Sequence, residues 1–228
     1  MPAPRMRVAL LGLTPGGMGL AQLMECAGHT VEELEDPQQL DGYQALILGV
    51  GEQQLERSIS AVEPHVHDRL IVIHTCLSRG VQVLDPLETR GCVVIAAAPT
   101  GFAPNGAETW LVSTLDELGE TIAELILGEN QATAVMLADA ARPAHAARIY
   151  YAAMLLRLSV IAVRETGLDE DPAVPFPHLW GDSADIIAAF RGIEEPGLRR
   201  AYRDVARRVG EVFQMHDLEL WALQEENR

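Results

Sequence analysis

Short hydrophobic runs alternate with helix-length segments over the first 137 residues. The runs are rich in aliphatic and β-branched side chains, which is typical of strands buried on both faces of a sheet. They lie at Arg7–Gly12, Thr30–Leu34, Tyr43–Val50, Leu70–His74, Cys92–Ala98 and Thr109–Ser113. Helices are expected between them, at Gly17–Ala27, Gln53–Ala61, Val81–Arg90 and Leu115–Leu127. The alternation predicts an α/β fold for residues 1–137: a Rossmann-like, doubly wound and mostly parallel sheet.

The pattern changes near Ala138, after which only helical periodicity remains. A long helix is expected at Pro143–Thr166, with its proline in the first turn, where a missing N–H is tolerated. A shorter helix capped by Asp182 or Ser183 follows, and a last helix is expected at Glu195–Gln224. Residues 138–228 are therefore predicted to form a small helical domain. Three helices have too few layers to enclose a substrate alone, so their apolar faces must pack on the first domain, on a second subunit or on both. We expect a homodimer through this domain, because the long helix would otherwise leave apolar surface in water.

Composition and charge narrow the choice of partners. The formal charge of −16 disfavours nucleic acid and anionic membrane surfaces. All 17 basic residues are Arg, and the absence of Lys excludes Schiff-base chemistry and a Walker-type phosphate loop. The three cysteines are too few for a disulfide framework. Neither a membrane span nor a signal peptide is expected, which predicts a cytoplasmic protein.

A glycine-rich turn joins the first strand to the first helix. Its candidate cofactor-binding residues are Gly12, Leu13, Gly16, Gly17, Met18 and Gly19. Glycines at this point let the backbone approach a pyrophosphate, which also meets the positive end of the helix. Gly12 and Gly16 are separated by three residues instead of the single residue in G-x-G-x-x-G, which predicts a lengthened loop. The alternative is a strand–helix turn that binds no nucleotide.

Two acidic residues, Glu35 and Asp36, follow the second strand. A carboxylate there, of which Glu35 is the candidate, accepts hydrogen bonds from the adenosine ribose and repels a 2′-phosphate. No Arg follows closely. The expected cofactor is therefore NAD in preference to NADP.

The opening segment resembles the β-hydroxyacid dehydrogenases and the wider 6-phosphogluconate dehydrogenase superfamily, whose first turn reads G-L-G-x-M-G and whose first helix ends in A-G-H. The matching residues, once inserted residues are allowed for, are Gly12, Leu13, Gly16, Met18, Gly19, Ala27, Gly28 and His29. Ala98-Pro99-Thr100-Gly101 is similar to the family's A-P-V-S-G motif. The resemblance implies a nucleotide-binding domain followed by a long helix, and substrate contacts at Pro99, Thr100 and Gly101.

The chain departs from this family at the catalytic lysine of the long helix, where Arg148 stands. Arg binds carboxylates well but transfers protons poorly, because its pKa lies above about 12. Two replacements are open. His74 ends a strand at the edge where such sheets bind ligands, unless the backbone satisfies its ring. Alternatively His145, Arg148 and Tyr151 share one helix face, unless that face is solvated or contacts a second subunit.

These features lead to one function and two alternatives. The sequence predicts an NAD(H)-dependent oxidoreductase acting on a small hydroxy or oxo compound that carries a carboxylate or a phenol. The alternatives are a lyase or isomerase on the same scaffold, using His and Arg or Tyr for proton transfer, and a nucleotide-binding protein without catalysis. No metal site is expected, because His65 and His67 lack an evident third ligand.

Overall fold

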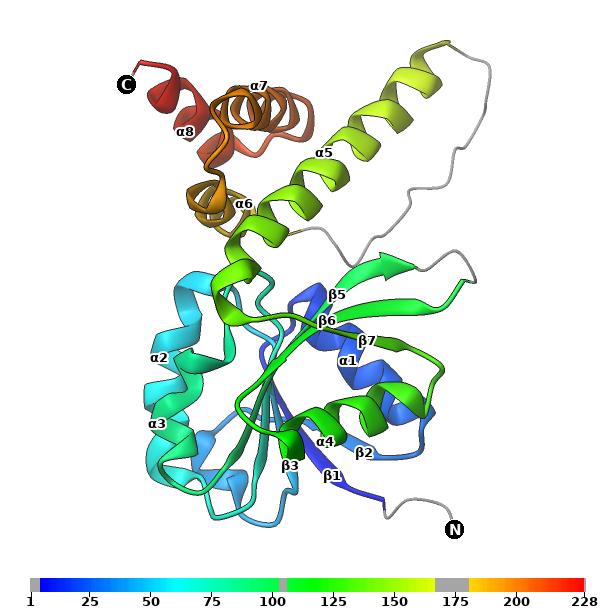
Figure 1. The fold of residues 1–228 in the computed structure, drawn as a ribbon, viewed down its shortest axis with the longest axis vertical. Coiled ribbons are helices and arrows are strands. Elements are labelled where there is room, and N and C mark those ends of the chain that lie inside the picture. The colour runs from blue at the N-terminus through cyan, green and yellow to red at the C-terminus, as the bar shows by residue number, and fades with distance from the viewer. Residues whose placement is uncertain (1–4, 103–105, 167–180, 228) are drawn as a thin grey trace. The chain divides into compact units, whose positions relative to one another are not determined.

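The chain folds into two compact units. The computed structural model describes residues 5–102, 106–166 and 181–227 (Figure 1). Unit 1 comprises Met1–Arg142 and unit 2 comprises Pro143–Arg228. The division falls five residues after the predicted domain boundary at 137. Residues 138–142, which include the 3-10 turn η4 (Asp139–Ala141), thus belong to the sheet unit.

Unit 1 is built on a seven-stranded sheet with the order β2-β1-β3-β4-β5-β6-β7. Its strands are β1 (Arg7–Leu11), β2 (Thr30–Glu33), β3 (Ala45–Leu48), β4 (Ile71–His74), β5 (Val93–Phe102), β6 (Glu108–Thr114) and β7 (Thr133–Met136). All neighbouring pairs are parallel except β5 and β6. The chain passes from β1 to β2 on one side and returns to β3 on the other, so the topological switch point lies between β1 and β3.

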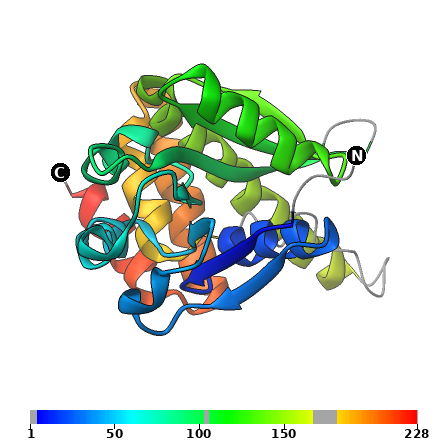
Figure 2. The same ribbon diagram turned by 90° about the horizontal axis from the view of Figure 1, so that it is seen from below.

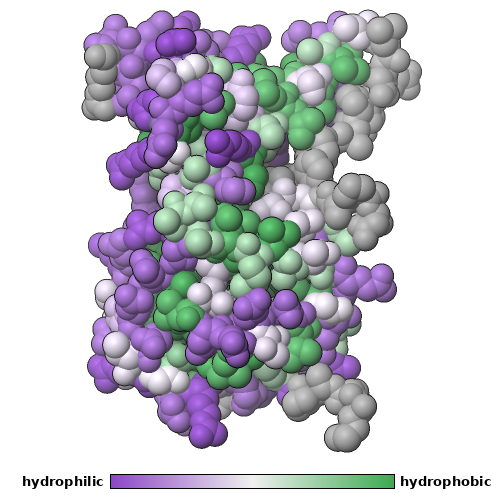
Figure 3. Space-filling view, in the orientation of Figure 1, coloured by the Kyte–Doolittle hydropathy of each residue, from purple (hydrophilic) through white to green (hydrophobic). Residues whose placement is uncertain are grey.

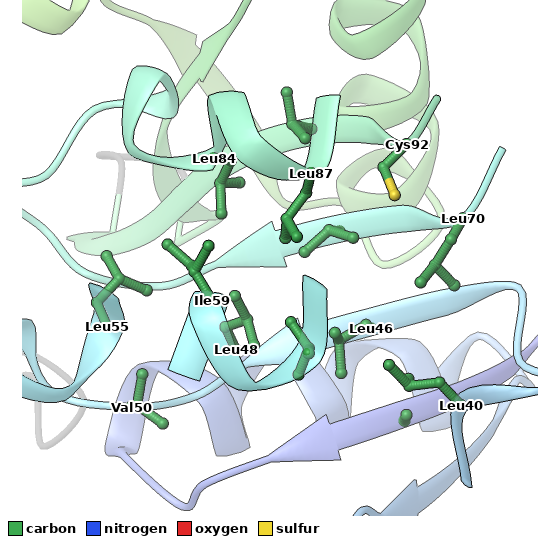
Figure 4. Close-up of a cluster of buried hydrophobic side chains, with 14 of the residues drawn as sticks. Leu40, Leu46, Leu48, Val50, Leu55, Ile59, Leu70, Leu84, Leu87 and Cys92 are labelled. Atoms are coloured by element: carbon green, nitrogen blue, oxygen red, sulfur yellow. The ribbon is translucent and has the colours of Figure 1, made fainter. Parts of the chain in front are cut away.

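Helices cover both faces of this sheet (Figure 2). One face carries α1 (Pro15–Cys26) and α4 (Glu117–Gly128), and the other carries α2 (Glu52–Val62), η3 (Val81–Leu84) and α3 (Asp85–Glu88). Leu48 on the sheet, Leu55 on α2 and Leu87 on α3 belong to one core cluster (Figure 4). Ile47, Leu20 on α1 and Ile126 on α4 belong to the other. Two apolar layers around a mostly parallel sheet confirm the predicted fold class.

Several predicted elements differ from those observed. The short edge strand β7 was not predicted, and the helix expected at Val81–Arg90 is a 3-10 turn followed by the single turn of α3. Short 3-10 turns also lie at η1 (Pro37–Leu40) and η2 (Glu63–His65). The last helix is two helices, because Gln214 adopts a left-handed conformation with φ 57° and ends the first of them.

Unit 2 is helical. It contains most of α5 (Arg142–Thr166), then α6 (Ser183–Ala189), η6 (Phe190–Gly192), α7 (Pro196–Phe213) and α8 (His216–Glu226). Gly210 lets α7 and α8 approach closely, because a Cβ there would lie 2.7 Å from the backbone nitrogen of Glu219. The hydroxyl of Tyr202 on α7 donates to the Ile186 carbonyl on α6 at 2.7 Å. These contacts hold the three C-terminal helices together.

Among the described residues, one helix has the length and composition of a membrane span. The segment Asp139–Thr166 has a mean hydropathy of 1.5 over its most apolar window, of which 33% is buried. No such segment was expected from the sequence. A single helix of this kind is weak evidence for a membrane span, because a core helix of a soluble protein can have the same length and composition.

Candidate functional site

The first crossover is a short turn. Strand β1 ends at Leu11 and helix α1 begins at Pro15, so only Gly12, Leu13 and Thr14 lie between them. Gly12 has φ +84°, a conformation that side chains disfavour, and this bends the chain sharply out of the strand. The loop lengthening predicted from the glycine spacing is therefore absent from the structure.

Gly12 in the turn and Gly17 in the first turn of α1 allow the backbone to approach the segment after β3 closely. A Cβ on Gly12 would lie 2.6 Å from the Gly49 carbonyl oxygen, and a Cβ on Gly17 would lie 2.5 Å from the Gly49 Cα. Gly49 directly follows β3, across the topological switch point. A tight first turn and close helix–strand packing are the functions of the first and third glycines of G-x-G-x-x-G. Gly12 and Gly17 therefore occupy these two places without any insertion.

Thr14 then occupies the place of the second glycine. It is the N-cap of α1, and its hydroxyl oxygen accepts a hydrogen bond from the Gly17 N–H at 3.3 Å. Its own N–H donates to the Gly49 carbonyl oxygen at 2.9 Å. None of the described residues accepts a hydrogen bond from the Gly16 N–H. The helix end thus keeps one unused donor beside a capping threonine.

The end of β2 brings an acidic residue to the same edge of the sheet. Leu10 of β1 pairs with Glu33 of β2, so the residues after β2 lie beside those that open the turn. The carboxylate of Asp36 accepts from the Gln38 N–H at 3.0 Å and caps η1. Glu35 is exposed and caps nothing. Glu35 is therefore the carboxylate available to a ligand beside this turn.

His74, the predicted acid–base residue, lies completely buried at the end of β4. Its Nε2 is 3.0 Å from the Gly80 carbonyl oxygen, and its Nδ1 accepts from the Cys76 N–H at 3.3 Å. This pairing requires the neutral ring with the proton on Nε2. Burial lowers the pKa of His74 to about 3, and the nearby Arg142 cation acts in the same direction. The geometry favours the alternative stated above, a histidine satisfied by backbone.

Arg142, which was not singled out from the sequence, is buried near His74. The side chain of Arg142 is fully buried. Its guanidinium donates to Ser113 Oγ at 3.1 Å and to the carbonyl oxygens of Cys76, Ala96 and Leu111 at 3.2–3.4 Å. Burial lowers its pKa to about 10, a value at which it still carries its charge at neutral pH. Arg142 therefore ties together the chain after β4 and strands β5 and β6.

Thr75 follows His74 and faces the glycine turn. Its side chain is 7% exposed, and its hydroxyl has no hydrogen-bond partner among the described residues. A Cβ on Gly16 would lie 3.3 Å from the Thr75 Cβ and 3.4 Å from Pro99 Cδ. The start of α1 therefore lies against the residues that follow β4 and against Pro99 of β5.

The segment predicted to border a substrate forms an irregular part of β5. The register with β6 shifts between Pro99 and Gly101, and Gly101 has φ 137°. The hydroxyl of Thr100 donates to the Thr109 carbonyl oxygen at 3.0 Å. Pro99 thus lies beside the glycine turn, whereas the Thr100 hydroxyl is used in a hydrogen bond within the sheet.

The predicted helix trio lies in unit 2, where its members are in different surroundings. His145 and Arg148 are exposed, whereas the Tyr151 ring stacks on Tyr202 with centroids 6.2 Å apart. Arg148 Nη1 donates to the Ala144 carbonyl oxygen at 3.3 Å, and no described carboxylate pairs with it. A pocket of about 270 Å³ is lined by Ala144, Arg148, Gly192, Ile193, Glu194, Glu195 and Leu198. Arg148 is the only one of the three that lines this pocket.

Other candidate groups have structural explanations. Among the described residues, no group of three or more His, Cys, Asp or Glu could hold a metal ion. The thiol of Cys76 is buried and donates to the Val50 carbonyl oxygen. On α7, Arg207 and Arg208 both pair with Glu211. These arginines therefore neutralise neighbouring carboxylates.

The chain is similar to one protein family over part of its length and to solved structures over almost all of it. Residues 169–225 match the family described as 6-phosphogluconate dehydrogenase C-terminal domain-like, and no curated protein matches. Mycobacterium tuberculosis 3-hydroxyisobutyrate dehydrogenase has a TM-score of 0.55 at 12% identity, over 97% of this chain and 94% of its own. The chain shares its fold with this dehydrogenase. This confirms, at the level of fold, the resemblance found in the sequence.

Two further structures extend this likeness. Plasmodium falciparum pyrroline carboxylate reductase, described with NADP bound, has a TM-score of 0.56 at 10% identity, over 96% of each chain. Prephenate dehydrogenase from A. aeolicus, described in complex with hydroxyphenyl propionate and NAD+, has a TM-score of 0.55 at 10% identity, over 100% of this chain and 88% of its own. At such identities the likeness concerns the fold.

Proposed function

We propose that this protein is an NAD(H)-dependent oxidoreductase that acts on a small hydroxy or oxo compound carrying a carboxylate or a phenol. The observation that carries the proposal is the approach of Gly12 and Gly17 to Gly49 at the switch point between β1 and β3. Open α/β sheets bind their ligands at such a point. Structures of the same fold are named as dehydrogenases and reductases, which supports this reaction class.

The residues of the crossover fit an adenine dinucleotide in most respects. The Gly16 N–H and the N-terminus of α1 would receive the pyrophosphate, and Glu35 would accept from the adenosine ribose. NAD is preferred to NADP because Glu35 and Asp36 would repel a 2′-phosphate. The bound cofactor would supply the nicotinamide ring that accepts or donates hydride.

On the substrate side, we assign binding of the anionic group to Arg148. Its guanidinium is exposed and no described carboxylate pairs with it, so it is available for two parallel hydrogen bonds to a carboxylate. Arg148 is too basic to move protons, and His74 has no free ring nitrogen, which leaves His145 as the proton carrier. Tyr151, whose ring stacks on Tyr202, is assigned a positioning contact with the substrate. In unit 1, Pro99, Thr100 and Gly101 stay candidate substrate-binding residues.

We further propose that the protein is a cytoplasmic homodimer joined through unit 2. The C-terminal half of α5 exposes Leu155, Leu156 and Val163, at 42%, 36% and 38% of their surface. Figure 3 shows hydrophobic residues gathered along the visible face of this helix. Contiguous apolar side chains on one helix face favour burial against a second copy.

Titration with NADH and NAD tests the function directly. A ligand that binds the folded state stabilises it by about 2.7 kcal/mol at a hundredfold excess over Kd, which calorimetry detects as a raised Tm. The Glu35→Gln variant should bind NADH more weakly and should lose part of its discrimination against NADPH. Exposed Glu124 on α4 serves no such role, so Glu124→Gln is the matched control. Absence of binding by either nucleotide would overturn the oxidoreductase assignment.

A further inference from the structure

At the start of α1, the side chain and backbone of Thr14 engage two N–H groups, those of Gly17 and of Thr14 itself, that would otherwise be available to a phosphate. Its hydroxyl oxygen accepts from the Gly17 N–H at 3.3 Å, and its backbone N–H donates to Gly49 at 2.9 Å. A threonine at the second glycine position also places a Cβ and a methyl group where a glycine would leave space for a pyrophosphate. The protein thus occupies part of its own anion site.

Unused polar groups beside Thr14 indicate that a ligand still binds there. The Thr75 hydroxyl is buried and has no partner among the described residues, and it lies against Gly16, whose N–H is also unused. A buried hydroxyl without a hydrogen bond is costly, so native proteins nearly always complete it with a protein group, a water or a ligand. The two observations are independent, because Thr75 follows β4 and Thr14 precedes α1.

We propose that Thr14 weakens the binding of a dinucleotide pyrophosphate at this site. The inference rests on the proposed function. A phosphate oxygen and the Thr14 hydroxyl compete for the same Gly17 N–H, so binding has to break the cap or do without that donor. Hydrogen bonds from N–H groups to an anion are about twice as strong as neutral ones. Removal of the competing hydroxyl should therefore tighten binding by about tenfold.

Three variants at position 14 separate the hydroxyl from the rest of the side chain. Thr14→Gly restores the dinucleotide motif, Thr14→Ala removes the hydroxyl but keeps a Cβ, and Thr14→Ser keeps the hydroxyl. The Kd for NADH, measured by nicotinamide fluorescence, should fall about tenfold or more in Thr14→Gly and severalfold in Thr14→Ala. Thr14→Ser should stay within about twofold of the wild type. Should Thr14→Gly fail to fold, Thr14→Ala carries the comparison alone.

The cap of α4 provides a matched control. Asp116 accepts from the Gly119 N–H at 2.8 Å, the same kind of contact as that of Thr14. Because β6 runs antiparallel to β5, α4 begins at the opposite edge of the sheet. Asp116→Gly should lower the Tm as loss of a cap does, and should leave the Kd for NADH unchanged.

The outcomes separate this inference from the proposed function. Tighter binding by Thr14→Gly than by a wild type that also binds supports both. Binding by Thr14→Gly alone supports the role of Thr14 and overturns the proposed function. Equal or weaker binding by Thr14→Gly overturns this inference only, as does a Thr14→Ser variant that binds as tightly as Thr14→Gly. Absence of NADH binding in all four proteins overturns both.

Discussion

The guanidinium of Arg142 donates to the carbonyl oxygen of Cys76 at 3.2 Å, inside a region without solvent exposure. The same side chain reaches carbonyl groups of β5 and β6, so one cation satisfies acceptors from three neighbouring parts of the sheet. Its acceptors are neutral oxygens, and no described carboxylate forms an ion pair with it. The charge is therefore stabilised by dipoles that point at it from the end of the sheet.

Replacement of this arginine should destabilise the fold more than replacement of a surface arginine. Arg142→Met keeps the approximate shape but leaves several buried carbonyl groups unsatisfied, each of which costs about 1–3 kcal/mol. We expect the free energy of unfolding in urea to fall by about 3 kcal/mol or more. Exposed Arg57 on α2 is the control, and Arg57→Met should stay within about 0.5 kcal/mol of the wild type. Equal stability of the two variants would contradict a structural role for Arg142.

His74 makes a specific contribution to acid sensitivity. Its folded-state pKa is about 3, below the ordinary value of 6.5, because burial disfavours the cation. Between these pH values the unfolded chain binds a proton that the folded chain does not, so stability falls as the pH is lowered from about 6.5. Each pH unit in this window should cost about 1.4 kcal/mol from this residue alone.

Urea unfolding at pH 7 and at pH 4.5 measures this contribution. His74→Gln removes the titrating ring, so the variant should lose about 2–3 kcal/mol less stability than the wild type over this interval. Exposed His145 is the control, and His145→Gln should show the same pH dependence as the wild type. If wild type and His74→Gln have parallel pH profiles, His74 is not held neutral in the fold.

Local sequence patterns were sufficient for the layered architecture. Buried runs such as Ala45–Leu48, in which every side chain is buried, stand out from their surroundings. Strand β7 was missed because most of its side chains are exposed and it pairs only with β6. The break at Gln214 was missed because neither glycine nor proline marks it. Strand β7 depends on its pairing with β6, whereas the break at Gln214 is marked by backbone hydrogen bonds from Gln214 and Met215 to the Gly210 carbonyl oxygen.

The candidate site shows the same limit. The spacing of Gly12 and Gly16 predicted an insertion in the turn. The approach of Gly12 and Gly17 to Gly49 shows instead that Thr14 stands at the position of the second glycine of the motif. The burial of Arg142 leaves no mark on the local pattern, which contains only an arginine before a proline. The turn can therefore be located from the sequence, but the roles of its individual residues depend on tertiary contacts.

The close approach of Gly17 to Gly49 should tolerate no side chain. Gly17→Ala would place a methyl carbon 2.5 Å from backbone, which forces the helix and strand apart. We expect a loss of about 2–3 kcal/mol in unfolding free energy, together with loss of NADH binding. Gly128, at the end of α4, has nothing within 4 Å of the same point, so Gly128→Ala should be neutral or stabilise by up to about 1 kcal/mol. Similar stability losses in both variants would show that glycine flexibility, and not this contact, is what matters.

The exposed apolar face of α5 predicts the oligomeric state. Leu155→Glu combined with Val163→Glu places two charges on that face, where burial against a second copy would be strongly unfavourable. We expect light scattering coupled to size exclusion to report a dimer for the wild type and a monomer for this double variant. Leu125 on α4 is more exposed than either, at 64%, but lies in unit 1, so Leu125→Glu should remain dimeric. A monomeric wild type, or a dimer that only Leu125→Glu dissociates, would exclude the helical unit as the interface.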